Sequence, residues 1–179
     1  MNKKVFWITE TAVLLALLVA LQYLTKGFGQ LVTGSCVNAI LAIAVLFVGL
    51  GSGITVALVS PVLAYLLGIA PQILVVPAIM AGNAVFVLVL HYLVSGRKPL
   101  LQIVGWIAAA LCKSAVLYLI VAKVICGVLA GSLLASGALK EPMLQALPAT
   151  FSWPQLVTAL IGGGLALLVV PALKKALKK

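Results

Sequence analysis

The sequence contains almost no acidic residues and few charged residues of any kind. Among 179 residues there are only two carboxylates, Glu10 and Glu141, and Asp is absent. Charged residues make up 8% of the chain and hydrophobic residues 65%, whereas a soluble domain averages about 25% charged residues. This shortage excludes a water-soluble globular domain. It indicates an integral protein of the lipid bilayer, which we expect to form one domain over residues 1–179.

The chain also lacks the residue sets that enzymes and nucleic-acid-binding proteins need. It has one His, and its three Cys show no CxxC or Cys/His spacing, so we expect no metal site and no cofactor. Without a Walker A motif, the chain is not expected to hydrolyse ATP by itself. The net charge of +10 comes mostly from Lys and Arg at the ends of apolar segments, where they set membrane topology. We therefore expect neither an enzyme nor a nucleic-acid partner.

Long apolar runs dominate what is present. A helix that crosses the hydrocarbon core needs about 20 apolar residues, and Gly, Pro and polar residues mark the breaks between runs. The pattern predicts an all-α integral membrane bundle of six transmembrane helices, over residues 5–25, 36–50, 54–68, 73–94, 100–128 and 153–173. Loops are expected over 26–35 and 130–152, with a tight turn over 49–53.

The distribution of basic residues gives the orientation of these spans. With six spans, both termini share a side, and that side collects eight basic residues: Lys3, Lys4, Arg97, Lys98, Lys174, Lys175, Lys178 and Lys179. The opposite side collects two, Lys26 and Lys140. Because basic residues are enriched in cytoplasmic loops, both termini are predicted to be cytoplasmic. We expect a multi-pass protein of the cell membrane, the bacterial plasma membrane.

The first apolar run carries a stripe of small residues, Ala12, Ala16 and Ala20. Four-residue spacing keeps these side chains on one face of a helix. In lipid, a face of small side chains allows another helix to approach closely. The stripe predicts a docking surface, although alanine is also simply common in membrane helices.

Two lysines lie inside the fifth span, and other polar residues fall at comparable depths. Lys113 is roughly 20 Å into its helix, where a charge is costly and usually functional. Lys123 lies nearer the outer interface, so a snorkelling role competes with a functional one. Further candidates for a pocket open to the outside are Asn38, Asn83, Tyr118 and Trp153. For Asn83 a helix–helix hydrogen bond is the alternative, and for Trp153 an interfacial anchor.

Three features are shared with a known family: six helices with both termini inside, the small size, and the run Ala12-Val-Leu-Leu-Ala16-Leu-Leu-Val-Ala20. In these the chain resembles the substrate-binding S component of energy-coupling factor (ECF) vitamin transporters. The long first outer loop, the short cytoplasmic turns, Pro77 and Gly82-Asn83 add to the resemblance, which covers the whole chain. It implies capture of a vitamin or precursor at the outer face and docking on a transmembrane coupling subunit that is attached to two cytoplasmic ATPases. It also implies that the alanine stripe is the docking surface.

In that family the ligand is held by the first loop and helices four to six, the region of Asn83, Lys113, Tyr118, Lys123 and Trp153. Two lysines without acids suggest a carboxylate or phosphate, as in the pantothenate, lipoate or niacin class. A neutral ligand is the alternative if Lys113 only donates hydrogen bonds to carbonyls. Two rival functions stay open at this point: a stand-alone small-molecule facilitator, and a structural membrane subunit with no ligand.

Overall fold

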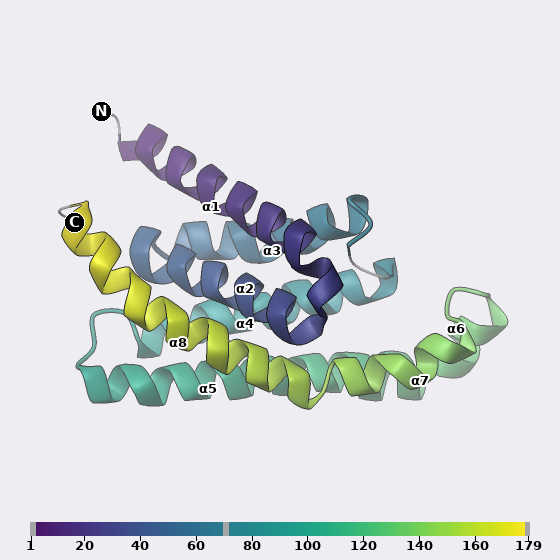
Figure 1. The fold of residues 1–179 in the computed structure, drawn as a ribbon. Helices are drawn as coiled ribbons and strands as arrows, with labels where there is room; N and C mark the ends of the chain where they lie inside the picture. Colours follow the sequence, from purple (N-terminus) through teal and green to yellow (C-terminus); the bar gives the residue numbers. More distant parts are fainter. Residues whose placement is uncertain (1–2, 70–71, 178–179) are drawn as a thin grey trace.

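A computed structural model describes residues 3–69 and 72–177, and every regular element in these ranges is helical (Figure 1). The elements are α1 (Lys3–Thr25), η1 (Lys26–Phe28), α2 (Gln30–Ile43), η2 (Ala44–Val48), α3 (Leu50–Leu66), η3 (Ile73–Val75), α4 (Val76–Leu93), α5 (Pro99–Tyr118), η4 (Leu119–Val128), α6 (Ala130–Ala135), α7 (Glu141–Thr150) and α8 (Trp153–Ala176). The all-α prediction is confirmed.

Six of these helical segments are apolar enough to form the membrane bundle. Five are also long enough to cross a bilayer: Lys4–Phe28, Gln30–Val48, Ile73–Leu93, Pro99–Val128 and Trp153–Ala176. The sixth, α3, has 17 residues and is therefore about 25 Å long, somewhat short of the roughly 30 Å of a hydrocarbon core. Pro61 lies inside α3, a position that membrane helices tolerate because neighbouring groups satisfy the freed backbone carbonyl.

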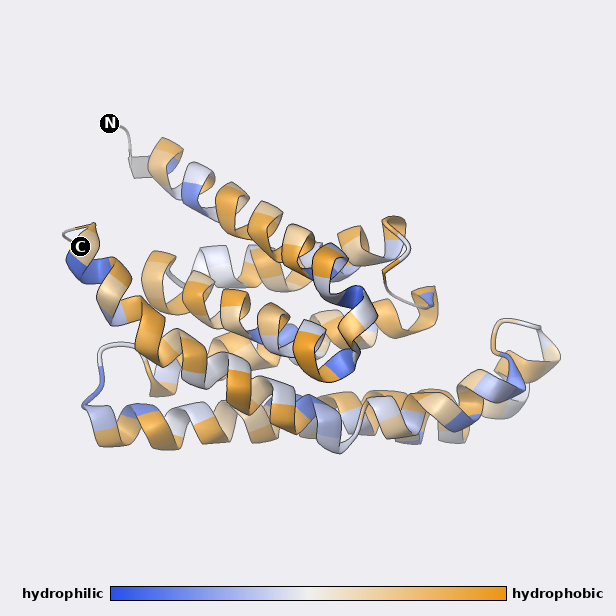
Figure 2. Cartoon of the chain, in the orientation of Figure 1, coloured by the Kyte–Doolittle hydropathy of each residue, from blue (hydrophilic) through white to orange (hydrophobic). Residues whose placement is uncertain are grey.

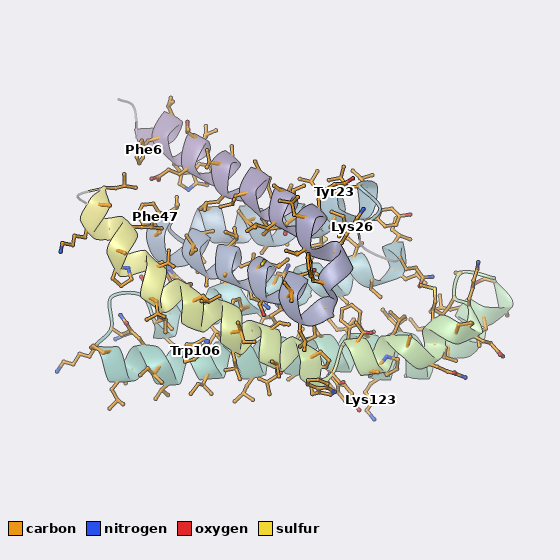
Figure 3. The ribbon with its side chains drawn as sticks, in the orientation of Figure 1. Phe6, Tyr23, Lys26, Phe47, Trp106 and Lys123 are labelled. Atoms are coloured by element: carbon orange, nitrogen blue, oxygen red, sulfur yellow. The ribbon has the colours of Figure 1, made fainter. Side chains whose placement is uncertain are left out.

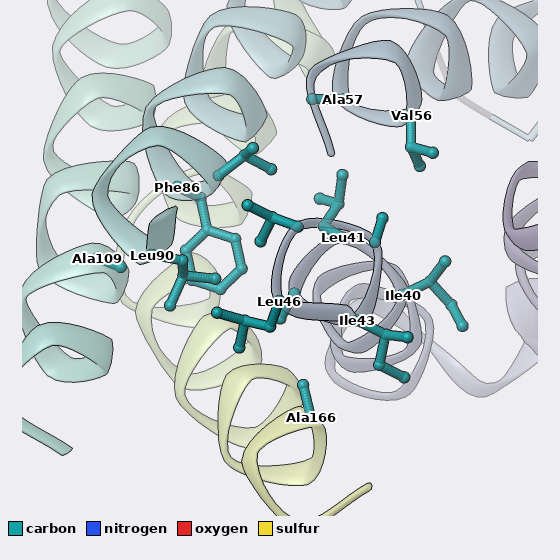
Figure 4. Packing of buried hydrophobic residues seen from close by; sticks show 14 of the residues in the cluster. Ile40, Leu41, Ile43, Leu46, Val56, Ala57, Phe86, Leu90, Ala109 and Ala166 are labelled. Atoms are coloured by element: carbon teal, nitrogen blue, oxygen red, sulfur yellow. The ribbon is translucent and has the colours of Figure 1, made fainter. Parts of the chain in front are cut away.

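The second helix lies at the centre of the bundle. Residues 40–46 of α2 and η2 are buried on every side, which is how a helix behaves when it is surrounded by others. It packs most extensively on α8, while α4 packs on α5 and α3 (Figure 1). Leu41 and Leu46 of this segment belong to the main hydrophobic core together with Phe86 and Leu90 of α4 (Figure 4).

The first helix is peripheral by comparison. It packs on α2 and α3 and crosses the bundle obliquely at its edge (Figure 1). Its inner face carries Thr11, Leu15, Leu18 and Gln22, which recur at helical spacing, and Leu18 is fully buried. Thr11 donates a hydrogen bond to Ser52 Oγ of α3 (3.0 Å). Within residues 3–69 and 72–177, no helix packs on the opposite face of α1.

Both ends of the described chain lie at one end of the bundle, and α6 and α7 lie at the other (Figure 1). Hydrophobic residues cover the sides of the helices, while hydrophilic ones gather at helix ends and within the bundle (Figure 2). This distribution fits a protein surrounded by lipid. The cytoplasmic location of the two chain ends stays a prediction from the basic residues. Lys178 and Lys179, which contribute to that assignment, lie outside the described residues.

The structure differs from the predicted boundaries around the second helix. The predicted loop over 26–35 is wrong in its second half, because α2 begins at Gln30 and only η1 and Gly29 separate it from α1. Gly29 has φ 83°, a conformation that favours glycine and lets the chain reverse sharply. The polar residues of this stretch resemble a loop, but on the helix Gln30 and Thr33 line a cavity inside the bundle.

Two further segments also differ. The turn predicted over 49–53 is confined to Gly49 (φ 128°), and α3 begins at Leu50. The predicted loop over 130–152 folds as two short helices, α6 and α7, which begin and end near Gly131, Gly137 and Pro142. The sequence also predicts a break between two spans over residues 69–72. Two of these residues, Ala70 and Pro71, lie outside the described residues.

Candidate functional site

A cavity of about 370 Å³ opens between the helices at the end of the bundle opposite the termini. Volumes of this size are typical of small-molecule sites, which begin at about 300 Å³. It is lined by the end of α1, the first half of α2, the end of α3, the first half of α4, the end of α5, α7 and the start of α8. Seven helices therefore converge on one site.

The polar part of this cavity is organised around a single buried ammonium group. Lys113 of α5 is 3% exposed, and its Nζ donates hydrogen bonds to Asn38 Oδ1 of α2 and to Asn83 Oδ1 of α4 (2.7 Å). The ring of Phe86 lies 5.4 Å from Nζ, within the range of a cation–π contact. Lys113 thus links α5 to α4, the helix before it in the chain, and to α2, which is distant in the sequence.

A second layer of hydrogen bonds orients the amide of Asn38. Its Nδ2 donates to Thr158 Oγ1 (3.2 Å), and Thr158 Oγ1 donates to the carbonyl of Gln155 on the same helix (3.1 Å). Gln155 Nε2 donates to the carbonyl of Thr150 at the end of α7 (3.3 Å). Because Asn38 Nδ2 is used in this way, its Oδ1 is directed at the ammonium of Lys113.

No carboxylate balances the charge of Lys113. The only acids in the sequence are Glu10 on α1 and Glu141 at the start of α7, and neither forms an ion pair with it. The two amide oxygens satisfy hydrogen bonds but carry only partial charges. The cavity therefore contains a buried positive charge with neutral neighbours, which is the electrostatic setting that favours an anion.

Two polar atoms at the cavity have no hydrogen-bond partner in the described part of the chain. Asn83 Nδ2 is buried without an acceptor, and Gln22 Oε1 is buried without a donor. Both residues line the cavity. Buried polar atoms are nearly always paired in proteins, so these two are open positions for a ligand or for water.

The rest of the cavity wall is largely apolar. One side is formed by α7 and the residue that follows it, through Met143, Leu147 and Phe151. Ile79 and Leu117 contribute from α4 and α5. A polar group at Lys113 combined with apolar walls suits a ligand that has one charged end and an organic body.

The structure brings together three of the six binding residues that the sequence suggested. Asn38, Asn83 and Lys113 meet at the cavity, whereas Tyr118, Lys123 and Trp153 are exposed and do not line it. Lys123 Nζ lies 5.7 Å from the ring centroid of Tyr118, on the outer side of the bundle (Figure 3). The reason lies in the helix period: Lys113 and Lys123 are ten residues apart, and the chain is π-helical from Leu119 onwards, so they face different directions.

Several lining residues were missed by reading the sequence alone. Gln22 is the clearest of them, because it follows Leu15 and Leu18 at helical spacing and so belongs to the inner face of α1. The residues of α7 were missed because 130–152 was predicted to be a loop. The helical spacing of the α1 residues could have identified Gln22 from the sequence. For α7, only the tertiary structure shows that its residues line the cavity.

The predicted docking residues lie on the free face of α1. Ala12, Ala16 and Ala20 are all exposed, on the side of the helix away from Leu18 and Gln22. Their small side chains leave a shallow surface in an otherwise large apolar face. No group of His, Cys, Asp or Glu that could hold a metal ion occurs among the residues that the structure describes.

A protein-family comparison agrees with this architecture. The family described as "ECF transporter, substrate-specific component" matches residues 8–174. Comparisons with curated proteins and with solved structures returned no match. Since the family match spans nearly the whole chain and includes every helix of the cavity, the chain belongs to the substrate-specific components of ECF transporters, the substrate-binding subunits of membrane importers.

Proposed function

We propose that this subunit captures a small, vitamin-like organic anion at the outer face of the membrane and delivers it to an ECF importer. The observation that carries the proposal is the buried ammonium of Lys113, which has two amide acceptors and no carboxylate. A carboxylate ligand such as pantothenate, lipoate or niacin supplies the missing charge.

The energetics favour an anion over a neutral ligand. Placing a lysine near the centre of a membrane helix costs about 2.5–3.5 kcal/mol on insertion scales. A hydrogen bond to a charged partner contributes about 1.5–3 kcal/mol, so pairing with a carboxylate recovers much of that cost. For this reason the free energy of the site is higher when it is empty than when a carboxylate occupies it. The site therefore selects its ligand by negative charge.

The position of the cavity supports capture from outside. Its lining includes α7 and the start of α8, which lie at the end of the bundle opposite the chain ends (Figure 1). The distribution of basic residues predicts that the chain ends are cytoplasmic. The apolar wall of α7 covers one side, where it excludes water from the ion pair. Exclusion of water strengthens the electrostatic attraction between ligand and lysine.

The outer face of α1 supplies the second half of the function. We infer that Ala12, Ala16 and Ala20 dock on a transmembrane coupling subunit that is attached to two cytoplasmic ATPases. The three alanines are exposed, and a helix of the partner can approach such a face closely. Ligand and partner thus contact opposite sides of one helix.

Replacement of Lys113 by Ala tests the ligand site. Titration calorimetry of the purified protein with each of the three carboxylates is expected to show affinity for at least one of them, and at least a tenfold loss in the variant, about 1.4 kcal/mol. Lys123→Ala is the matched control, because Lys123 lies on the same continuous helical segment but outside the cavity. An unchanged dissociation constant in Lys113→Ala would show that the Lys113 ammonium does not bind the ligand.

A second variant keeps the test informative if Lys113→Ala does not fold. Asn83→Asp places a carboxylate where Asn83 Oδ1 now accepts a hydrogen bond from Lys113. The internal ion pair is expected to keep the bundle folded and to abolish binding of carboxylate ligands. Retention of full affinity in Asn83→Asp would contradict the proposal, because an internally neutralised lysine has no charge left for the ligand.

A further inference from the structure

The cavity contains more open hydrogen-bonding positions than a simple alkyl carboxylate can fill. Besides the ammonium of Lys113, these are the buried donor Asn83 Nδ2 and the buried acceptor Gln22 Oε1. No described residue donates a hydrogen bond to Gln22 Oε1. Gln22 reaches the cavity from α1, whereas Asn83 and Lys113 reach it from α4 and α5. Each open position restricts the chemistry of the ligand.

Asn83 Nδ2 and Lys113 Nζ form one recognition unit. Lys113 Nζ donates to Asn83 Oδ1 (2.7 Å), and Nδ2 belongs to the same amide group. The two donors are therefore close enough for the two oxygens of one carboxylate to accept from both, since a carboxylate offers only acceptor oxygens. These two donors bind the anionic end of the ligand, so Gln22 must contact another part of the ligand.

Gln22 Oε1 requires the opposite chemistry. It is an acceptor, so a carboxylate oxygen placed against it would be repelled, and an apolar group would leave it unpaired. Leaving a buried acceptor without a donor costs the desolvation of that group. A site built in this way rejects analogues that lack the matching donor far more strongly than analogues that lack a methylene group.

We propose, on the basis of the function proposed above, that the ligand is a carboxylate whose body carries an N–H or O–H group, and that Gln22 is the residue that selects it. The carboxylate accepts from Lys113 and Asn83, and the N–H or O–H group donates to Gln22 Oε1. Met143, Leu147 and Phe151 contact the apolar part between these two ends. Alkyl or aryl carboxylates without a donor are poor ligands for this site.

Four carboxylate probes test the inference. Pantothenate (amide and hydroxyl groups) and biotin (ureido N–H groups) carry donors, whereas lipoate and nicotinate carry none apart from the acid itself. Biotin and lipoate form a matched pair, since both join a sulfur-containing ring to the same five-carbon acid. Calorimetry on the full-length protein in detergent is expected to show at least one donor-bearing probe binding at least tenfold more tightly than either donor-free probe.

The variant Gln22→Met removes the acceptor and keeps the length of the side chain. It is expected to weaken the preferred donor-bearing probe at least fivefold and to leave donor-free probes unchanged or slightly tighter. Gln145→Met, an exposed position on α7 outside the cavity, is the matched control and is expected to behave as the wild type.

The outcomes separate this inference from the function on which it rests. If a donor-free probe binds as tightly as the donor-bearing ones, with dependence on Lys113 but not on Gln22, the inference is overturned and the proposed function stands. If none of the four carboxylates binds the folded protein, both are overturned. If Gln22→Met weakens all four probes equally, Gln22 acts on packing rather than on selection, and the inference is overturned.

Discussion

Adding one methyl group at Gly162 is expected to separate α8 from α2 and to weaken the ligand site. A Cβ at this position would lie 2.5 Å from the Ser35 carbonyl oxygen, and 2.6 Å from both the Ala39 nitrogen and Asn38 Cβ. Two of these three atoms belong to the backbone of α2, so no side-chain rotation can relieve the clash. The two helices must move apart instead.

The magnitude follows from these distances. Nonbonded carbon atoms prefer separations of about 3.5–4.0 Å, so Gly162→Ala requires the helices to separate by about 1 Å. Overpacking of this kind typically costs about 1–3 kcal/mol. The hydrogen bond from Asn38 to Thr158 is already 3.2 Å long, and a separation of about 1 Å would break it. Loss of one such bond is worth about 1 kcal/mol, or about fivefold in affinity.

Two measurements on the purified protein check this reasoning. The apparent Tm of Gly162→Ala is expected to fall by about 2–12 °C, because each kcal/mol corresponds to about 2–4 °C in a chain of this size. The dissociation constant for the tightest carboxylate probe is expected to rise about fivefold, since Asn38 no longer directs its oxygen at Lys113.

Gly131→Ala is the matched control. A Cβ at Gly131 meets no atom within 4 Å, so this variant is expected to keep its affinity and to gain up to about 1 kcal/mol from the lower entropy of the unfolded chain. A folded Gly162→Ala protein with unchanged Tm and unchanged affinity would refute the argument, because it would mean that α2 and α8 do not hold the site rigidly.

Two further predictions concern docking and topology. Ala16→Trp fills the shallow face of α1 and is expected to abolish co-purification with a coupling subunit and two ATPases. The control Leu168→Trp, at a highly exposed position on α8, is expected to retain co-purification. Equal recovery of the partners with both variants would exclude the alanine stripe as the docking surface. In a variant with its native cysteines replaced, Ser95→Cys is expected to react with an impermeant thiol reagent only from the cytoplasmic side and Ser136→Cys only from outside. The reverse labelling pattern would contradict the orientation derived from the basic residues.

Most of the architecture could be predicted from the sequence because the bilayer imposes strong rules on it. The spans that begin near Val5, Leu100 and Trp153 are found where apolar length alone predicts them. Hydrophobic length is a local property, and satisfaction of the backbone in lipid leaves helices as the only choice for a chain of this kind. The face of α1 that we propose for docking can be read from the sequence for the same reason, since Ala12, Ala16 and Ala20 follow the helical period.

The errors arose where local polarity does not reveal what surrounds a residue. Residues 30–35 contain Gln30, Thr33 and Ser35 and resemble a loop, yet they belong to α2. Gln30 and Thr33 line the cavity. Residues 130–152 are interrupted by Gly and Pro but fold as α6 and α7, which pack next to the continuation of α5. In a membrane protein, a stretch with polar residues or helix breakers can be a loop or a helix that lines a cavity. Which of the two it is depends on the neighbouring helices.

The sequence by itself determined that Lys113 is a buried charge without an acidic partner, because depth in a span and the scarcity of acids are both countable. It could not determine which residues meet that charge. Asn38 and Asn83, which accept hydrogen bonds from Lys113, lie 75 and 30 residues away along the chain. Their meeting depends on how α2, α4, α5 and α8 pack, and on the close approach that Gly162 allows. Tertiary structure decided the composition of the site, because hydrogen bonds between distant segments depend on helix packing that no local pattern records.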